Sequence, residues 1–200
     1  MCPMLQNRFR APVTAIISPV ARWLLKIGLT PNVLTVIGAL GSSLCAIFFF
    51  SQGNFFLGTI LVTFFVLSDL LDGTMARQSQ VGPTKLGALI DSTLDRVSDA
   101  AIFIGILLFA HNENLSAISY AALVALVTGT LIPYIRAKAE SLGVECSVGI
   151  AERTERLILV LVGTGLFGLG IEWALSLSLY VICLASSITV IQRILVVAKA

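Results

Sequence analysis

Long runs of uncharged, apolar residues, separated by short polar stretches, limit what this chain can fold into. Five runs carry no charge, 33–51, 54–68, 115–135, 157–171 and 173–192, and a sixth, 97–111, contains only Asp99. A helix that spans a bilayer needs roughly 20 apolar residues, and each run approaches this length with its polar flanks. Charged residues make up 12% of the chain, about half their share in a soluble domain. We therefore predict an all-α integral membrane protein with six transmembrane helices.

The basic residues predict an orientation for these spans. All 13 Lys and Arg residues fall on one side of the predicted bundle, and the opposite connections, 51–54, 111–114 and around Glu172, contain none. Because basic residues mark cytoplasmic connections, both termini are expected in the cytoplasm. We predict a multi-pass protein of the plasma membrane.

The segment before the first span differs from the rest of the chain. Residues 8–28 alternate apolar residues with basic ones and contain no acid; the basic residues are Arg8, Arg10, Arg22 and Lys26. This pattern is typical of an amphipathic helix on an anionic membrane surface, which we favour over a disordered tail or a cleaved signal peptide. The sequence thus predicts a juxtamembrane segment, 1–31, followed by a membrane domain, 32–200.

Four carboxylates recur at helical spacing between residues 68 and 100. One face of the first helix here carries Asp69, Asp72, Gly73 and Ala76, and one face of the next carries Gly87, Asp91 and Asp95. Gly82-Pro83 ends the first helix and permits a turn. Two antiparallel helices would then bring two pairs of carboxylates together at the cytoplasmic end, where the small residues allow close approach.

Such a cluster needs counter-charge. Arg77 and Arg96 could form a structural ion-pair network with the acids, but ionisable residues inside a membrane are functional by default. Oxygen ligands without His or Cys suit Mg²⁺ or Mn²⁺. Because Mg²⁺ completes its coordination with water and substrate phosphates, the cluster indicates a phosphate-bearing, lipid-linked substrate.

The string Asp69-x₂-Asp72-Gly73-x₂-Ala76-Arg77-x₉-Gly87-x₃-Asp91-x₃-Asp95 resembles the complete signature of the CDP-alcohol phosphotransferases. The stretches PVARWLLKIGLTPNV, YIRAKAE, ERTERLILV and IQR are similar to the bacterial phosphatidylinositol-phosphate synthases within that family. The resemblance implies six helices around a cytoplasm-facing cavity, in a homodimer. It also implies transfer from CDP-diacylglycerol to inositol 1-phosphate, with loss of CMP, in phospholipid biosynthesis. Membrane lipids are expected partners, and nucleic acid is not.

The resemblance also implies residue roles. Two Mg²⁺ ions, for which Mn²⁺ could substitute, would be bound by Asp69, Asp72, Asp91 and Asp95. Asp95 would also be the general base, because a weakly metal-bound carboxylate remains basic. CDP-diacylglycerol would be contacted by Asn32, Val33, Leu34, Thr35, Gly73, Ala76, Arg77, Thr84 and Gly87.

Three arginines at the cytoplasmic ends of spans four, five and six would bind the acceptor's phosphate: Arg136, Arg156 and Arg193. Arginine grips phosphate through two hydrogen bonds, although simple positive-inside anchoring is an alternative for each one. We expect Asp99 to be a buried hydrogen-bonded acid or the partner of an arginine, and Arg153 to be a snorkelling or surface residue. Pro133 would either shape the phosphate pocket or merely kink its helix.

Three other functions fit parts of the pattern. A phosphatidylglycerol-phosphate synthase would use glycerol 3-phosphate, which also carries a phosphate. A divalent-cation transporter would need acids through the whole bilayer depth, whereas the four predicted acids gather at one end. A structural membrane scaffold has no use for the acidic signature.

Overall fold

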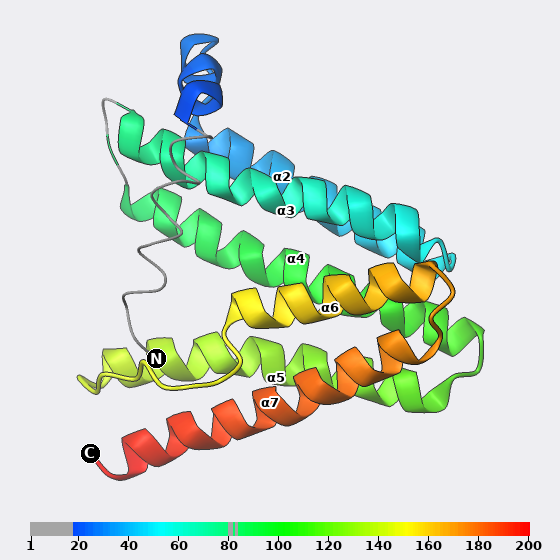
Figure 1. Cartoon of the computed structure of the whole chain (residues 1–200). Coiled ribbons are helices and arrows are strands. Elements are labelled where there is room, and N and C mark those ends of the chain that lie inside the picture. The colour runs from blue at the N-terminus through cyan, green and yellow to red at the C-terminus, as the bar shows by residue number, and fades with distance from the viewer. Residues whose placement is uncertain (1–17, 80–81, 83) are drawn as a thin grey trace. The chain divides into compact units, whose positions relative to one another are not determined.

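The computed structural model describes residues 18–79, 82 and 84–200, with the side chains of Asp69 and Leu70 outside that description. Throughout these residues the regular secondary structure is helical, without strands (Figure 1). The predicted all-α class is therefore confirmed for the described part of the chain. Of the predicted interfacial helix, Arg8 and Arg10 lie outside the described residues, whereas residues 18–26 form a helix.

Beyond residue 30, the described chain contains six helical segments that overlap the six apolar runs. They are α2 (Pro31–Cys45) with its π-helical continuation η1 (Ala46–Phe50), α3 (Phe55–Gln78), α4 (Lys85–Asn112), α5 (Ser116–Ser141), α6 (Arg153–Gly168) and α7 (Trp173–Ala198).

Four helices of the described chain are long and apolar enough to cross a membrane: α2 with η1, α3, α5 and α7. The other two differ for separate reasons. α6 has 16 residues and measures about 24 Å, less than the ~30 Å of a hydrocarbon core. α4 has 28 residues, but its first 15 residues include five charged ones, Lys85, Asp91, Asp95, Arg96 and Asp99.

The connection between α3 and α4 shows how the predicted helix break forms. The Gly82 N–H donates to Ser79 Oγ at 3.1 Å, and Gly82 has a φ of +70°, which glycine adopts without steric cost. Thr84 then caps α4, because its Oγ1 accepts a hydrogen bond from the Gly87 N–H at 3.0 Å. The break predicted at Gly82 is confirmed, and Pro83 lies outside the described residues.

The chain separates into two compact units. Unit 1 is formed by Met1–Ser42 and Thr63–Val97, and unit 2 by Ser43–Val62 and Ser98–Ala200. The four predicted catalytic-site acids belong to unit 1, and the three predicted acceptor arginines belong to unit 2.

Two glycines bring α2 close to α3 in unit 1. A Cβ atom added to Gly38 would lie 2.1 Å from Ser68 Oγ, and one added to Gly41 would lie 2.4 Å from the ring of Phe65. Only glycine permits this approach, and the two helices run side by side in Figure 1. The short separation lets polar side chains meet between the first turns of α2 and the last turns of α3.

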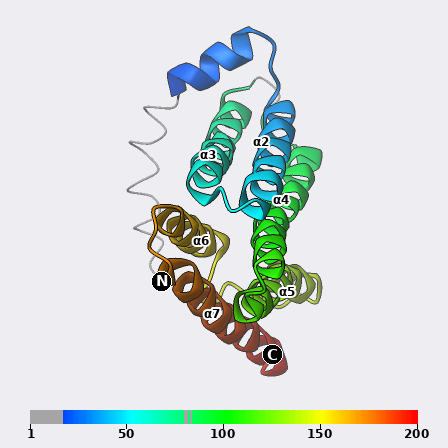
Figure 2. The same ribbon diagram turned by 90° about the vertical axis from the view of Figure 1, so that its right-hand side faces the viewer.

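Unit 2 is built around α7, which packs against both α5 and α6 (Figures 1 and 2). An aromatic cluster joins the end of η1 to the ends of three more helices within this unit. Phe55, 1% exposed, stacks on Phe50 with ring centroids 5.2 Å apart and meets Phe109 and Phe167 edge-on at 4.8 and 4.9 Å. These contacts hold the start of α3, the end of α4 and the end of α6 together.

The contact between α4 and η1 depends on Gly105. A Cβ at this position would lie 2.4 Å from the Ala46 carbonyl oxygen, so the backbone would have to move. We expect Gly105→Ala to lower the free energy of unfolding by about 1–3 kcal/mol through overpacking, measured by unfolding in detergent. Gly165→Ala is the matched control, because its Cβ would only reach ordinary contact with Thr59, at 3.4 Å. Equal losses in both variants would contradict the assigned role of Gly105.

Candidate functional site

The acids predicted to act together lie on the two helices that their spacing indicated, α3 and α4. Asp72 is on α3 and 6% exposed, and Asp91 and Asp95, one turn apart on α4, are half-buried. Asp69 belongs to the same helix as Asp72, and its side chain is outside the described set. Burial of carboxylates in an apolar helix bundle is costly unless partners satisfy them, so their placement here requires a stabilising environment.

Thr35 provides one such partner. Its hydroxyl donates a hydrogen bond to Asp72 Oδ2 at 2.5 Å, and a hydrogen bond to an ionised carboxylate is stronger than one between neutral groups. The contact joins the first turns of α2 to α3, where Gly38 allows the helices to come close. A residue predicted to contact the nucleotide therefore orients a residue predicted to bind metal, a relation that the sequence pattern did not indicate.

Three more of the predicted nucleotide-contacting residues meet where α2 and α4 begin. A Cβ added to Gly87 would lie 2.9 Å from Asn32 Oδ1 and 3.0 Å from Thr84 Oγ1. Glycine at position 87 thus lets two polar side chains converge on the first turn of α4. Of their neighbours on α2, Val33 is 45% exposed and Leu34 is half-buried.

The last three predicted nucleotide-contacting residues lie on α3. Arg77 is exposed, and its Nη2 donates to Thr74 Oγ1 at 3.1 Å. Beside Gly73, an added Cβ would meet only Arg77 Nη1, at 3.7 Å, and Ala76 one turn later is half-buried. The small residues therefore leave space beside the arginine. Thr74, 2% exposed, is a positioning residue that the sequence analysis missed.

The donor chemistry of these acids fits a hard divalent cation, since it consists of carboxylate oxygens with a threonine hydroxyl fixing one of them. Among the described side chains, no three His, Cys, Asp or Glu residues are arranged to hold a metal ion. Asp69, one of the four predicted ligands, is not among those side chains.

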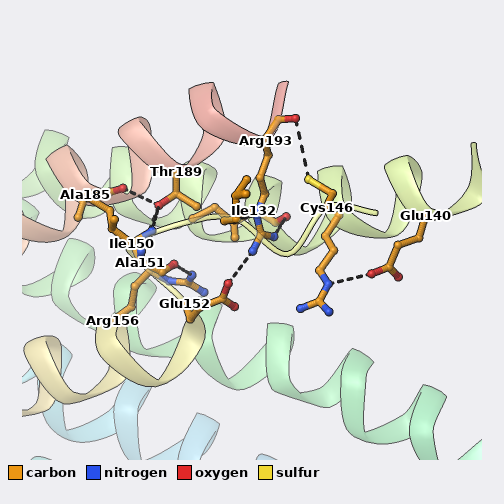
Figure 3. A network of polar contacts seen from close by, with 12 residues as sticks. Ile132, Glu140, Cys146, Ile150, Ala151, Glu152, Arg156, Ala185, Thr189 and Arg193 are labelled. Atoms are coloured by element: carbon orange, nitrogen blue, oxygen red, sulfur yellow. Dashed lines mark hydrogen bonds and ion pairs between the residues drawn. The ribbon is translucent and has the colours of Figure 1, made fainter. Parts of the chain in front are cut away.

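Arg193, on α7, is almost fully enclosed in unit 2. Its side chain is 1% exposed, and each of its nitrogens has a partner. Nε donates to Val148 O at 2.9 Å, Nη1 to Ile132 O at 2.6 Å and Nη2 to Glu152 Oε1 at 2.8 Å. Two backbone carbonyls and one carboxylate therefore set the plane of this guanidinium (Figure 3).

Arg156, in the first turns of α6, is also buried, at 5% exposure. It donates through Nη1 to Ala151 O at 3.0 Å and through Nη2 to Gly129 O at 3.5 Å. Gly129 lies four residues before Pro133 on α5. Because proline has no N–H, it cannot bond the carbonyl four residues earlier, and this leaves the Gly129 carbonyl available to Arg156.

Asp99 pairs with two arginines of α6. Arg153 Nε lies 3.2 Å from Asp99 Oδ1 and Arg156 Nη2 lies 3.5 Å from Oδ2. The expectation that Asp99 is the partner of an arginine is confirmed, and its side chain is half-buried, at 16% exposure. Arg153, expected to be a snorkelling or surface residue, is half-buried, with 27% of its side chain exposed in this ion pair.

The segment that connects α5 to α6 joins these groups. The N–H groups of Ile150 and Ala151 both donate to Thr189 Oγ1 at 3.1 Å, which fixes the segment on α7 (Figure 3). Gly149 has a φ of +144°, and a Cβ there would lie 2.5 Å from Thr189 Cγ2. Arg156 and Arg193 consequently meet at adjacent residues, the carbonyl of Ala151 and the carboxylate of Glu152.

Arg136, the third predicted acceptor-binding arginine, has a different setting. Its side chain is 46% exposed and pairs with Glu140, one turn later on α5, at 2.9 Å. Partly exposed pairs of this kind contribute little to stability. The structure thus gathers Arg156 and Arg193 in one network and leaves Arg136 available on the surface.

Comparison with known proteins gives consistent matches over nearly the whole chain. The family model of the CDP-alcohol phosphatidyltransferases matches residues 28–198. Phosphatidylinositol phosphate synthase of Mycobacterium tuberculosis is 43% identical over 189 residues, covering 92% of this chain and 87% of the relative. The corresponding synthase of Cutibacterium acnes is 44% identical over 204 residues, covering 97% of this chain and 98% of the relative.

The fold is similar to solved structures of the M. tuberculosis synthase. One, with CDP-DAG bound, superposes with a TM-score of 0.87 at 42% identity, covering 92% of this chain and 94% of that one. Another, in complex with manganese and citrate, has a TM-score of 0.84 at 41% identity, covering 90% and 88% of the two chains. The resemblance in the acidic signature is thereby confirmed, and this chain belongs to the CDP-alcohol phosphatidyltransferase family.

Proposed function

We propose that this enzyme transfers the phosphatidyl group of CDP-diacylglycerol to inositol 1-phosphate, forming phosphatidylinositol phosphate and CMP. The observation that carries the proposal is the similarity to phosphatidylinositol phosphate synthases, at 43% identity over 92% of the chain. The buried carboxylate Asp72 and the half-buried pair Asp91 and Asp95 supply the acidic site that such a transfer needs.

In the proposed reaction, a hydroxyl oxygen of the acceptor attacks the β-phosphorus of CDP-diacylglycerol. A new P–O bond forms, the bond to the bridging oxygen breaks, and that oxygen leaves with CMP. Asp95 accepts the proton of the attacking hydroxyl as general base. Asp95 is the fourth acid, one turn beyond Asp91 on α4, and as a weakly held metal ligand it would remain basic enough to take this proton.

Four acids are the proposed ligands of two Mg²⁺ ions, with Mn²⁺ as a substitute: Asp69, Asp72, Asp91 and Asp95. Divalent cations bound there would neutralise charge on the attacking and leaving oxygens. The manganese complex of the M. tuberculosis synthase and the oxygen-only donor set support this assignment. The hydroxyl of Thr35 keeps one oxygen of Asp72 oriented.

CDP-diacylglycerol is proposed to bind along the starts of α2 and α4 and the end of α3. The contacting residues are Asn32, Val33, Leu34, Thr35, Gly73, Ala76, Arg77, Thr84 and Gly87. The convergence of Asn32 and Thr84 at Gly87 supports a polar contact surface, and the exposed Arg77 supports a phosphate contact. The acceptor's phosphate is proposed to bind Arg136, Arg156 and Arg193.

We also propose six transmembrane spans in the plasma membrane, with both termini and the active site cytoplasmic, and a homodimer. The one-sided distribution of basic residues supports the orientation. The helix at 18–26 supports an interfacial segment within residues 1–31, ahead of the membrane domain 32–200. Val20 and Trp23 of this helix are 48% and 59% exposed, and Gln78 Nε2 donates to Ser18 Oγ at 3.0 Å, which ties it to α3.

The direct test is release of CMP from CDP-diacylglycerol by the purified protein with Mg²⁺. Inositol 1-phosphate, glycerol 3-phosphate and free inositol would be offered separately. Release with inositol 1-phosphate alone supports the proposal. Release with glycerol 3-phosphate instead would retain the chemistry and replace the acceptor, giving a phosphatidylglycerol-phosphate synthase. A folded protein that releases no CMP with any acceptor would refute the proposed function.

From the hydrogen bond between Thr35 and Asp72 we predict how a substitution at position 35 changes this activity. We expect Thr35→Val to slow CMP release about 10- to 100-fold, because a hydrogen bond to a charged group contributes about 1.5–3 kcal/mol. Thr35→Ser retains the hydroxyl and should keep most of the activity. Steady-state rates of the two variants would be compared. A valine variant as active as the serine variant would show that this hydroxyl does not position Asp72.

A further inference from the structure

We propose that Glu152 occupies the place of the acceptor's phosphate on Arg193 and is displaced when the acceptor binds. The inference rests on the proposed function, since it concerns the site assigned to the acceptor. It identifies Glu152 as a residue that sets the affinity and specificity of that site.

Arg193 is enclosed by its partners. At 1% exposure, this side chain cannot bind an acceptor's phosphate unless one of its partners moves. Ile132 O and Val148 O are backbone atoms, the first inside α5 and the second in a segment fixed by Thr189. Glu152 is therefore the partner that a ligand can replace, at Nη2 of Arg193.

Glu152, in contrast to Arg193, is partly exposed to solvent. Its side chain is 45% exposed, so its carboxylate can return to water at little cost. Glu152 is also the residue that precedes α6, yet its side chain makes no capping hydrogen bond to that helix. The release of Glu152 from Arg193 therefore breaks no side-chain capping hydrogen bond at the start of α6.

Asp99, the other acid paired with these arginines, is held more firmly than Glu152. That carboxylate is 16% exposed and contacts two arginines, so removing it would leave two guanidinium groups without their acid. Glu152 contacts one arginine through one oxygen at 2.8 Å. Of the two acids in this network, Glu152 is the one whose departure costs less.

The buried guanidinium of Arg193 requires a negatively charged partner. A buried charge that loses its partner is strongly destabilising, so Arg193 needs an anion whether or not the acceptor is present. Glu152 supplies it in the free enzyme, and a phosphate oxygen supplies it in the complex. An alcohol without a phosphate offers no replacement, so the exchange favours phosphorylated acceptors.

The test compares three variants in CMP release with Mg²⁺. Glu152→Gln keeps a neutral acceptor for Arg193, and Glu152→Asp keeps the charge on a side chain one methylene shorter. Both are expected to lower the KM for inositol 1-phosphate about two- to fivefold, with an unchanged KM for CDP-diacylglycerol. Glu155→Gln removes an exposed acid from the same turn of α6 and should leave both KM values as they are.

Several outcomes would overturn the proposal. An unchanged or raised KM in both Glu152 variants would show that this carboxylate does not compete with the acceptor. An equal fall in Glu155→Gln would show a general effect of net charge. Stabilisation by inorganic phosphate, measured as a shift in Tm, gives a readout without catalysis and should be larger in Glu152→Gln than in wild type. Because this Tm shift does not depend on catalysis, it tests the role of Glu152 separately. The proposed function is tested by CMP release from the wild-type protein.

Discussion

Replacing Asp95 with asparagine is expected to slow CMP release about 10²- to 10⁴-fold, the usual contribution of a general base. Asparagine has nearly the same size and can still accept a hydrogen bond, but it cannot take the proton of the attacking hydroxyl. Because the change lies on a half-buried face of α4, folding should persist. Single-turnover release of CMP, together with binding of CDP-diacylglycerol, would measure the effect.

Two comparisons make the test of Asp95 specific. Asp91→Asn, which removes a proposed metal ligand, should lose activity that high Mg²⁺ partly restores, whereas no metal concentration should restore Asp95→Asn. Glu113→Gln, at an exposed position beyond the end of α4, should behave as wild type. If Asp95→Asn retains more than about a tenth of the wild-type rate, another group takes the proton, since a base contributes at least about 10²-fold.

Replacing Arg193 with alanine should produce the largest loss of stability. The change removes a side chain that is 1% exposed and leaves Ile132 O, Val148 O and Glu152 without their donor. Breaking a buried ion pair by removing one partner costs about 3–5 kcal/mol. We expect a marked fall in Tm and earlier unfolding in denaturant, measured in detergent.

Arg136→Ala provides the matched control for Arg193→Ala. Arg136 is 46% exposed and its pair with Glu140 is local to α5, so its loss should change stability by less than about 1 kcal/mol. The two variants remove the same side chain and the same charge. Similar Tm values for both would show that the network around Arg193 does not hold the segment between α5 and α6 in place.

Local sequence patterns were sufficient to predict the helices and the spacing of the acids along them. Apolar runs must form helices in a bilayer, because each helix satisfies its own backbone polar groups, and the spacing of Asp91 and Asp95 then places both on one face. The end of α3 and the start of α4 followed from local turn chemistry at Gly82. These features depend on neighbouring residues in the chain, so a single sequence predicts them.

The burial and the partners of the proposed acceptor arginines became clear only from the tertiary structure. Their positions in the sequence placed Arg136, Arg156 and Arg193 at similar helix ends. The sequence did not indicate that two of them are buried and the third is exposed. Pro133 did carry a signal, because a proline inside a helix frees the carbonyl four residues earlier, here that of Gly129. Which side chain uses this carbonyl depends on how α5 and α6 approach each other. Contacts between residues far apart in the chain, such as Thr35 with Asp72 and Glu152 with Arg193, have no local sequence pattern, and only the packing of the helices decides them.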